Sequence, residues 1–191
     1  AAIADAHSLE AAGDKILRPL ADGRLGSASG PWPGLIALDG NLTEALLADI
    51  SRSPLFAAAD LRVAPASPGK AERLLPLLSH PTATLYVNLE EANLLSKSHS
   101  TTAGGAARAL LARGAAAVLV TDGGKPAAEG RRGQGVIEGT PPPVLVTRVT
   151  GAGDTFMAAH IVAEARGAPR EASLAAALRA AADYVSGEIG S

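Results

Sequence analysis

The sequence predicts an α/β fold in which a mostly parallel sheet is flanked by helices. Short apolar runs of the length of buried strands alternate with segments that have the periodicity of helices. Hydrophobic residues make up 47% of the 191 residues, but aromatic residues make up only 3%. Such an aliphatic composition is typical of helices packed on parallel strands, which are buried on both faces. The length is that of one domain or of a part of a larger one.

Four short apolar runs rich in valine, leucine and alanine are predicted as parallel strands. The most strand-like of them reads Ala-Ala-Val-Leu-Val-Thr. Residues 13–34 contain many Gly, Pro and Ser residues and no clear strand. Residues 127–146 are broken by glycines and by three consecutive prolines, and we expect them to form short antiparallel strands. The predicted parallel strands are 35–39, 60–64, 84–87 and 116–121.

The segments between and after these strands are predicted as helices. Asn41 or Thr43 can accept the hydrogen bond that caps the first helix, and Gly114 suits the C-terminal cap of a later one. Residues 69–79 are amphipathic, with one apolar face made of Ala71, Leu74, Leu75 and Leu78. The predicted helices are 43–50, 54–59, 69–79, 90–95, 102–113, 152–165 and 171–185.

Charge and cysteine content exclude several classes of protein. The formal net charge is -2 and the isoelectric point is about 6.1, whereas nucleic-acid-binding surfaces are usually basic. The chain has no cysteine, so it has neither a disulfide framework nor a thiolate metal site. Its four histidines lack the spacing of metal ligands, and we expect all four to lie on the surface or in loops.

The start of the chain shows no targeting signal. Residues 1–7 lack the basic start and apolar core of a signal peptide, and no apolar run is long enough to span a membrane. We therefore expect a cytoplasmic protein that has neither nucleic acid nor membrane as a partner. The chain begins with Ala1 rather than methionine, and we expect it to be a fragment or a processed form.

Several polar residues follow predicted strands directly. Asp39, Asn88 and Thr121 each end a predicted strand, and the turn at 151–154 follows the apolar residues 144–147. Ligands of parallel sheets bind at the carboxyl ends of the strands. We therefore expect these residues to meet at one edge of the sheet.

Residues 150–156, Thr-Gly-Ala-Gly-Asp-Thr-Phe, carry the most specific chemical signal. They open a predicted helix, so the N–H groups of Gly151, Ala152 and Gly153 have no earlier carbonyl to bind. These donors and the positive end of the helix dipole make a site for an anion such as phosphate. Asp154 repels phosphate, but a carboxylate there can take a proton from an attacking hydroxyl. The turn therefore indicates phosphoryl transfer to an alcohol.

Other interpretations of this turn are open or excluded by its neighbours. An ordinary strand-to-helix loop explains Gly-x-Gly-Asp alone about equally well. The turn is not a Walker A loop, because no Gly-Lys-Ser/Thr follows it. It is not a dinucleotide-binding fingerprint, because Phe156 stands where that pattern needs a third glycine.

The string at 150–156 closely resembles the C-terminal signature of the PfkB-type, or ribokinase-like, carbohydrate kinases. The resemblance extends over about 35–185 and implies a three-layer ribokinase-like fold. It also implies that residues 1–191 are a single partial kinase domain, the half with the nucleotide site and the catalytic base. The N-terminal part of the fold and its lid would then be missing.

The resemblance assigns roles to the residues of the turn. It makes Asp154 the catalytic base, and it makes the amides of Gly151, Ala152 and Gly153 the anion hole for the transferring phosphate. Phosphoryl transfer depends mainly on positioning and charge stabilisation, which fits these residue types. Arg148 is a departure, because many members of the family have an acidic residue there.

Asn88 and Glu91 form an Asn-x-x-Glu motif at a predicted strand end. Taken alone, the motif indicates a helix cap with a solvated glutamate. The resemblance implies instead that Asn88 and Glu91 organise Mg²⁺ and the phosphates through water, which suits the preference of Mg²⁺ for oxygen ligands and retained waters. We expect Glu90 to be solvated.

Thr121, Gly123 and Gly124 follow the next predicted strand. The Asp122-Gly123 pair alone indicates a β-turn. The segment is similar to the Thr-x-Gly-x-x-Gly loop that lines the nucleotide in the family, so the resemblance implies ATP contacts from Thr121, Gly123 and Gly124. Pro126 replaces the last glycine of that loop.

A further resemblance concerns the acceptor. The segment around Lys70 looks like one in the pseudouridine-kinase branch, which implies a nucleoside or sugar acceptor, although Lys70 fits a surface residue equally well. Asp39 and Asn41 are explained equally by a turn and a helix cap, and we assign them no catalytic role. The matching residues are Pro65, Ser67, Lys70, Ala71, Glu91 and Ala92.

Three hypotheses follow for function. The first is a kinase that uses ATP and Mg²⁺, with a monovalent cation as a further candidate cofactor, to phosphorylate a small sugar or nucleoside. A homodimer is among the assemblies that this hypothesis allows. The second is a non-catalytic or degenerate nucleotide-binding fragment that lacks the acceptor site. The third is a plain α/β protein whose turn binds another anion.

Overall fold

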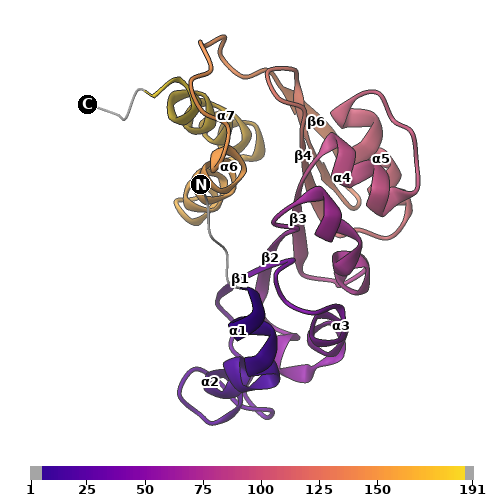
Figure 1. Cartoon of the computed structure of the whole chain (residues 1–191), viewed down its shortest axis with the longest axis vertical. Helices are drawn as coiled ribbons and strands as arrows, with labels where there is room; N and C mark the ends of the chain where they lie inside the picture. The colour runs from indigo at the N-terminus through magenta and orange to yellow at the C-terminus, as the bar shows by residue number, and fades with distance from the viewer. Residues whose placement is uncertain (1–5, 188–191) are drawn as a thin grey trace.

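The computed structural model describes residues 6–187, which contain a six-stranded sheet (Figure 1). The strands follow one another across the sheet in chain order. The first four run parallel, and the last two run antiparallel to their neighbours. The predicted α/β class and mostly parallel sheet are therefore confirmed. The strands are β1 Leu35–Asp39, β2 Asp60–Ala64, β3 Ala83–Asn88, β4 Ala117–Thr121, β5 Ala127–Arg131 and β6 Gly135–Gly139.

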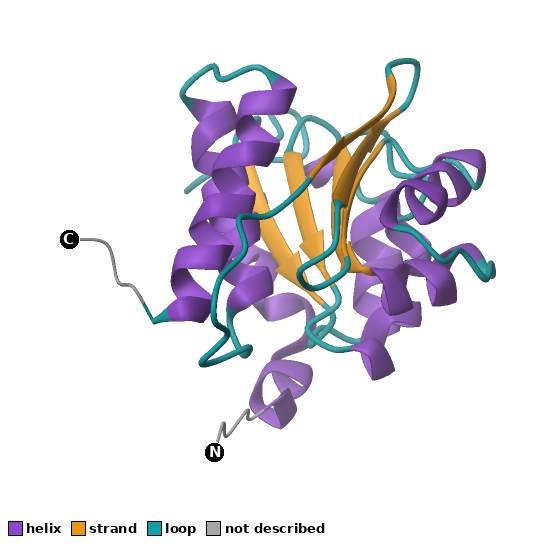
Figure 2. Cartoon of the chain, turned by 90° about the horizontal axis from the view of Figure 1, so that it is seen from above, coloured by secondary structure: helices purple, strands orange, loops and turns teal. Residues whose placement is uncertain are grey.

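Helices cover both faces of this sheet. The α-helices are α1 Ala6–Ala12, α2 Arg18–Ala21, α3 Glu44–Arg52, α4 Leu89–Ser96, α5 Ala103–Ala112, α6 Ala152–Ala165 and α7 Arg170–Ser186, and the 3-10 helices are η1 Gly13–Leu17, η2 Pro54–Phe56 and η3 Pro68–Leu77. Figures 1 and 2 show α6 and α7 side by side on one face, and α3, α4 and α5 on the other. Among the helices of residues 6–187, none combines the length and the hydropathy of a membrane-spanning segment.

The predicted helix at 69–79 is the 3-10 helix η3. Pro76 lies inside it and has no N–H to donate to an α-helical carbonyl, which explains the tighter and less regular winding. Three of the four residues predicted on its apolar face are buried. Leu75 is only partly buried, and Leu77 is buried instead.

Residues 144–146, the last part of the segment predicted as antiparallel strands, form no strand but lie in the long loop between β6 and α6. Leu145 is 82% exposed. The three prolines that precede this segment supply no N–H groups for a ladder, so the chain leaves the sheet after β6. The antiparallel prediction for 127–146 is therefore confirmed only for β5 and β6.

The two faces of the sheet carry different chemistry. Side chains alternate between the faces along a strand, so Leu85 and Val87 of β3 pack under α3 to α5, whereas Tyr86 faces α6 and α7. The same alternation places Arg62 of β2 and Glu129 of β5 on the side of Tyr86. The apolar core beneath α6 and α7 is consequently small, and polar contacts supply the rest of the packing.

Glu129 of β5 connects the sheet to both helices of this layer. Its side chain is fully buried, and Oε1 accepts hydrogen bonds from Arg131 and, at 3.1 Å, from Arg170 of α7. Oε2 lies 3.6 Å from Nε2 of His160, a buried residue of α6. Burial alone would raise the pKa of Glu129, but His160 and the two arginines outweigh it and hold that pKa at about 2.

Glu164 of α6 completes the network beneath the helix. It pairs with Arg62 of β2 and with Arg131 of β5. Arg62 also donates to Oη of Tyr86 at 2.9 Å. A guanidinium can only donate, so the Tyr86 hydroxyl accepts from it and has its own proton free for Nδ1 of His160, which is 2.9 Å away. Charged and polar groups thus fix the C-terminal half of α6 on the sheet.

The prediction that all four histidines are surface or loop residues is wrong for His160, which lies in α6 and is 0% exposed. His80 lies in the loop between η3 and β3, as predicted, although it is only 6% exposed. His160 is buried because the sheet presents polar partners to it, and Nδ1 of His80 accepts a hydrogen bond from the N–H of Thr82 at 3.3 Å. His99 is exposed as expected. The side chain of His7 lies outside the described residues.

Replacing Glu129 by glutamine should destabilise the fold strongly. The variant keeps the size of the side chain but leaves Arg131 and Arg170 beside a neutral group. Removing one partner of a buried ion pair costs about 3 kcal/mol, and we expect a loss of that size in the free energy of unfolding, measured by urea denaturation at neutral pH. Glu138→Gln, at a half-exposed carboxylate of β6, serves as the control and should change the free energy by less than about 0.5 kcal/mol.

The same variant should lose part of the acid dependence of stability. The pKa of Glu129 lies below its unfolded value, so its contribution is present above about pH 5 and is lost as the pH falls toward 2. The free energy of unfolding of the parent protein should therefore fall more steeply over this pH window than that of Glu129→Gln. Identical pH profiles of stability for the two proteins would contradict the lowered pKa of Glu129.

Candidate functional site

The carboxyl ends of the parallel strands bring three of the predicted residues to one edge. Asn88 at the end of β3 and Thr121 at the end of β4 are direct partners in the register of the sheet. Asp39 ends β1 opposite Ala64 of β2. The predicted shared edge is confirmed for these strand ends. The turn at 151–154 follows a loop rather than a strand and joins the site through α6.

Asn88 and Glu91 form a capping box at the start of α4. Oδ1 of Asn88 accepts from the N–H of Glu91 at 2.9 Å, and Oε2 of Glu91 accepts from the N–H of Asn88 at 2.8 Å. Glu91 is buried, which raises the pKa of its carboxyl, while the Asn88 N–H acts in the opposite direction. The helix-cap interpretation is confirmed, but Glu91 is buried rather than solvated. Glu90 is exposed as expected.

The capping box limits how these residues could hold Mg²⁺. It occupies Oδ1 of Asn88 and one oxygen of Glu91, and Oε1 of Glu91 takes no part in it. Across the described residues, no group of three or more His, Cys, Asp or Glu side chains could hold a metal ion. Oε1 of Glu91 is therefore the side-chain oxygen of the capping box that remains for an ion or its water.

Gly151 has a backbone conformation that other residues rarely adopt. It precedes α6 with φ +93°, in the left-handed region that favours glycine. A Cβ at this position would lie 2.5 Å from Oη of Tyr184 in α7. That hydroxyl donates to the carbonyl of Thr150 at 2.9 Å, and the N–H of Thr155 donates to the carbonyl of Gly151 at 2.9 Å. The turn is therefore fixed from both sides and has room only for glycine at 151.

Three N–H groups at this helix start are available to a ligand. Those of Gly151, Gly153 and Asp154 donate to no carbonyl in the described part of the chain, whereas that of Ala152 donates to Val149 at 3.0 Å. The carboxylate of Asp154 is exposed and pairs with no side chain between residues 6 and 187. The helix dipole adds to the attraction of these donors for an anion.

Arg148 holds the segment before the turn on α7. Its Nε donates to the carbonyl of Tyr184 at 2.7 Å, and its guanidinium lies 3.9 Å from the centre of the Tyr184 ring. The N–H of Thr147 donates to the carbonyl of Val185 at 2.7 Å. A carboxylate at position 148 could neither donate to that carbonyl nor make the cation–π contact. The departure from an acidic residue thus has a structural reason.

A cavity of about 340 Å³ brings the predicted nucleotide and anion residues together. Thr121, Gly123 and Gly124 line it from the end of β4, and Ala152 and Gly153 line it from the start of α6. Its volume lies in the usual range for small-molecule sites. The other lining residues are apolar; they are Ala127, Pro141, Pro142, Pro143, Val144, Val146, Val149, Phe156, Leu178, Ala181, Ala182 and Val185.

Sequence reasoning missed most of these apolar walls and the role of Tyr184. Apolar residues at helical spacing in α7 give the same pattern whether they face a core or a cavity. The signal available in the sequence was the apolar run Val144–Val146 directly after three prolines. The structure shows Val146 57% exposed. Exposed apolar residues that lie together often mark a binding site.

Asp39, Asn41 and Lys70 form a polar group at the ends of β1 and β2. Asp39 accepts from the N–H and from Nδ2 of Asn41 at 3.0 Å and 2.7 Å, and Nζ of Lys70 donates to Oδ1 of Asn41. Lys70 is therefore partly buried and hydrogen-bonded rather than a free surface residue. The cap of α3 is Thr43, whose Oγ1 accepts from the N–H of Leu46 at 3.2 Å.

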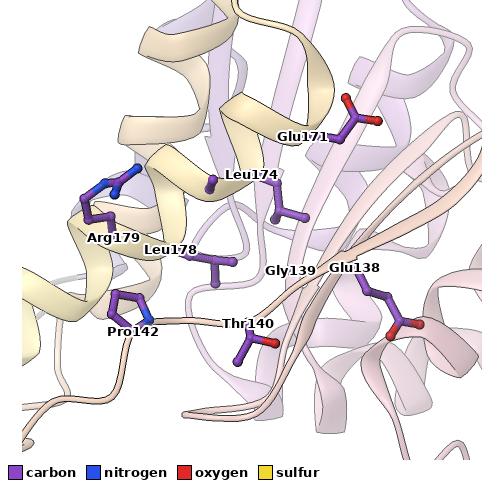
Figure 3. A pocket seen from close by; sticks show the side chains of 9 residues that line it. Glu138, Gly139, Thr140, Pro142, Glu171, Leu174, Leu178 and Arg179 are labelled. Carbon is purple, nitrogen blue, oxygen red and sulfur yellow. The ribbon is translucent and has the colours of Figure 1, made fainter.

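A second hollow of about 420 Å³ lies between β6 and α7 (Figure 3). Figure 3 shows Glu138 and Glu171 on its walls together with Arg179. It shares Pro142 and Leu178 with the first cavity, but it contains none of the residues that the sequence predicts for the site. We assign no ligand to it.

The model of the pfkB family carbohydrate kinases matches residues 29–188 of the chain. No curated protein matches the sequence. Solved structures with the same fold include a carbohydrate kinase from Agrobacterium tumefaciens, which is 23% identical with a TM-score of 0.75. The similarity covers 100% of this chain and 61% of that kinase.

Two other solved structures are similar in the same way. Ribokinase from Arabidopsis thaliana, solved with ribose and ATP, is 23% identical over 90% of this chain and 53% of its own, with a TM-score of 0.68. Adenosine kinase from Schistosoma mansoni, in complex with 2-fluoroadenosine, is 20% identical over 79% of this chain and 50% of its own, with a TM-score of 0.64. The ribokinase-like fold is thereby confirmed. The chain spans between about half and three fifths of the length of these kinases.

Alanine substitutions at two glycines of the turn should have opposite effects on stability. In Gly151→Ala the methyl group must occupy a positive φ and collide with Tyr184, so we expect a loss of about 2 kcal/mol in the free energy of unfolding. Gly153→Ala is the matched control, because a Cβ there meets nothing within 4 Å and alanine is the better helix former by about 0.5 kcal/mol. Thermal denaturation measures both, and equal melting temperatures would contradict the model of the turn.

Proposed function

Since the chain belongs to the pfkB family of carbohydrate kinases, we propose that it transfers the γ-phosphoryl group of ATP to a hydroxyl of a small sugar or nucleoside. The carrying observation is the cavity of about 340 Å³, in which apolar walls and the amide-bearing start of α6 meet. Apolar walls suit a nucleotide base, and amides at a helix start suit its phosphates. The ribose and ATP in the similar ribokinase and the 2-fluoroadenosine in the similar adenosine kinase support the two acceptor classes.

In the proposed reaction, Asp154 acts as the base and the turn stabilises the charge. The acceptor oxygen bonds to the γ-phosphorus while the bond to the bridging oxygen of ADP breaks, and the hydroxyl proton passes to Asp154. The N–H groups of Gly151 and Gly153 and the α6 dipole stabilise the charge on the phosphoryl oxygens. The N–H of Ala152 joins them when a bound phosphate displaces the carbonyl of Val149. The exposed, unpaired carboxylate at 154 supports this role.

Mg²⁺ would accompany ATP and neutralise its phosphates. We propose that Asn88 and Glu91 act on this ion through water, with Oε1 of Glu91 as the oxygen that the capping box leaves out. Thr121, Gly123 and Gly124 would contact the nucleotide itself. A monovalent cation is a further proposed cofactor and is assigned to no residue.

The finer acceptor class we propose is a pseudouridine-like nucleoside. The Pro65, Ser67 and Lys70 pattern supports it, and so does the bond from Lys70 to Asn41, which places an ammonium group at the carboxyl ends of β1 and β2. A panel of nucleosides and sugars, assayed for phosphate transfer from ATP, ranks the acceptors directly. Faster transfer to ribose than to pseudouridine would overturn this finer assignment.

A second candidate function is nucleotide binding without transfer. It is favoured by the hydrogen bond between Ala152 and Val149, which occupies one of the three predicted anion-hole amides. A thermal shift with ATP and Mg²⁺, together with an assay for ADP formation, separates the two functions. Binding without ADP formation supports the non-catalytic function.

Replacing Asp154 by asparagine should lower turnover about 10²- to 10⁴-fold, the usual contribution of a positioned base. Binding of ATP should stay within a few-fold, because the amide is isosteric and the phosphate donors are unchanged. Steady-state kinetics with ATP and the best acceptor, together with calorimetric titration of ATP, gives both values. Asp183→Asn, at an exposed carboxylate of α7, is the control and should leave both unchanged. If turnover is unchanged in Asp154→Asn, Asp154 is not the catalytic base.

A further inference from the structure

The walls of the nucleotide cavity contain almost no polar side chain. Thr121 carries a hydroxyl, and every other lining residue is glycine, alanine, valine, leucine, proline or phenylalanine. The wall formed by Pro141, Pro142 and Pro143 also lacks backbone N–H groups, because proline has none. This wall therefore has no donor for the ring nitrogens or the keto oxygen of a base.

The one side-chain polar group in the lining does not select one base edge. The hydroxyl of Thr121 rotates to donate or accept, so it serves an amino group and a keto group equally well. Strong discrimination between ligands requires buried polar groups that the wrong ligand leaves unpaired, whereas apolar pockets reject isosteric ligands by about 10²-fold or less.

We propose, resting on the function proposed above, that this cavity binds purine nucleotides by burial and shape and does not distinguish adenine from guanine. The phosphoryl donor is thus a purine nucleoside triphosphate rather than ATP alone. The base stacks against apolar side chains, chiefly those of Val146, Phe156 and Leu178, and the phosphates extend to the amides of Gly151 and Gly153. Pyrimidines bury less apolar surface in the same space and bind more weakly.

Competition binding with the full chain tests this proposal. A fluorescent ADP analogue is displaced by ADP, GDP, IDP and UDP in the presence of Mg²⁺, with inorganic tripolyphosphate as a probe that has no base. We expect the dissociation constants of ADP, GDP and IDP to agree within about 10-fold, that of UDP to be higher, and tripolyphosphate to compete poorly.

The outcomes separate this inference from the proposed function. ADP that binds more than about 100-fold more tightly than GDP overturns the inference and leaves the kinase proposal in place. Tripolyphosphate that competes as well as ADP also overturns it, since the base would then contribute nothing. If no nucleotide binds at all, the proposed function fails together with the inference.

Two loop variants show whether the bases occupy this cavity. Val146→Trp fills the space from a residue that lines it and is 57% exposed, so the fold should tolerate the larger side chain. We expect it to weaken ADP and GDP binding by a similar factor of at least about 10, the loss expected when more than one methylene-sized contact is removed. Leu145→Trp is the matched control, because Leu145 is 82% exposed and does not line the cavity. Unchanged binding in Val146→Trp, or a loss for only one of the two nucleotides, overturns the proposal.

Discussion

The position of α6 on the sheet depends on the buried carboxylate of Glu129 and on the polar groups gathered around it. The face beneath α6 and α7 has few apolar side chains, so the buried partners of Glu129, His160 and Glu164 take the place of a larger core. Such contacts are directional, and breaking one member leaves the others unpaired in a buried environment. They therefore set the register of α6 more narrowly than apolar packing would.

This register matters because α6 carries the candidate site at its other end. The network fixes the C-terminal half of the helix through His160 and Glu164. The start of the helix carries the free amides and Asp154 at the carboxyl edge of the sheet. Catalytic groups on rigid elements keep their geometry better than groups on loops. The walls of the cavity come from the loop and from α7, whereas the groups proposed to touch phosphate belong to the anchored helix.

Sequence reasoning predicted the parts of the fold that depend on local pattern. The four parallel strands, the two last helices and the glycine turn follow from apolar runs, helical periodicity and the Gly-Ala-Gly-Asp string at a helix start. It failed where a partner distant in sequence decides the outcome. The burial of His160 depends on Tyr86 and Glu129 from two strands, and spacing along α6 contains no trace of them. The strand prediction for 144–146 was wrong because these apolar residues have no neighbouring strand to pair with after β6.

The contacts between Arg148, Thr147 and the end of α7 join the last described turn of the chain to the loop that precedes α6. The carbonyl of Val185 accepts the hydrogen bond of Thr147, and Val185 also lines the cavity of about 340 Å³. The end of α7 is therefore a structural part of the site and not a tail beyond it. For protein engineering, this means that a truncation that removes the last turn of α7 would open one wall of the cavity and free the loop that precedes α6.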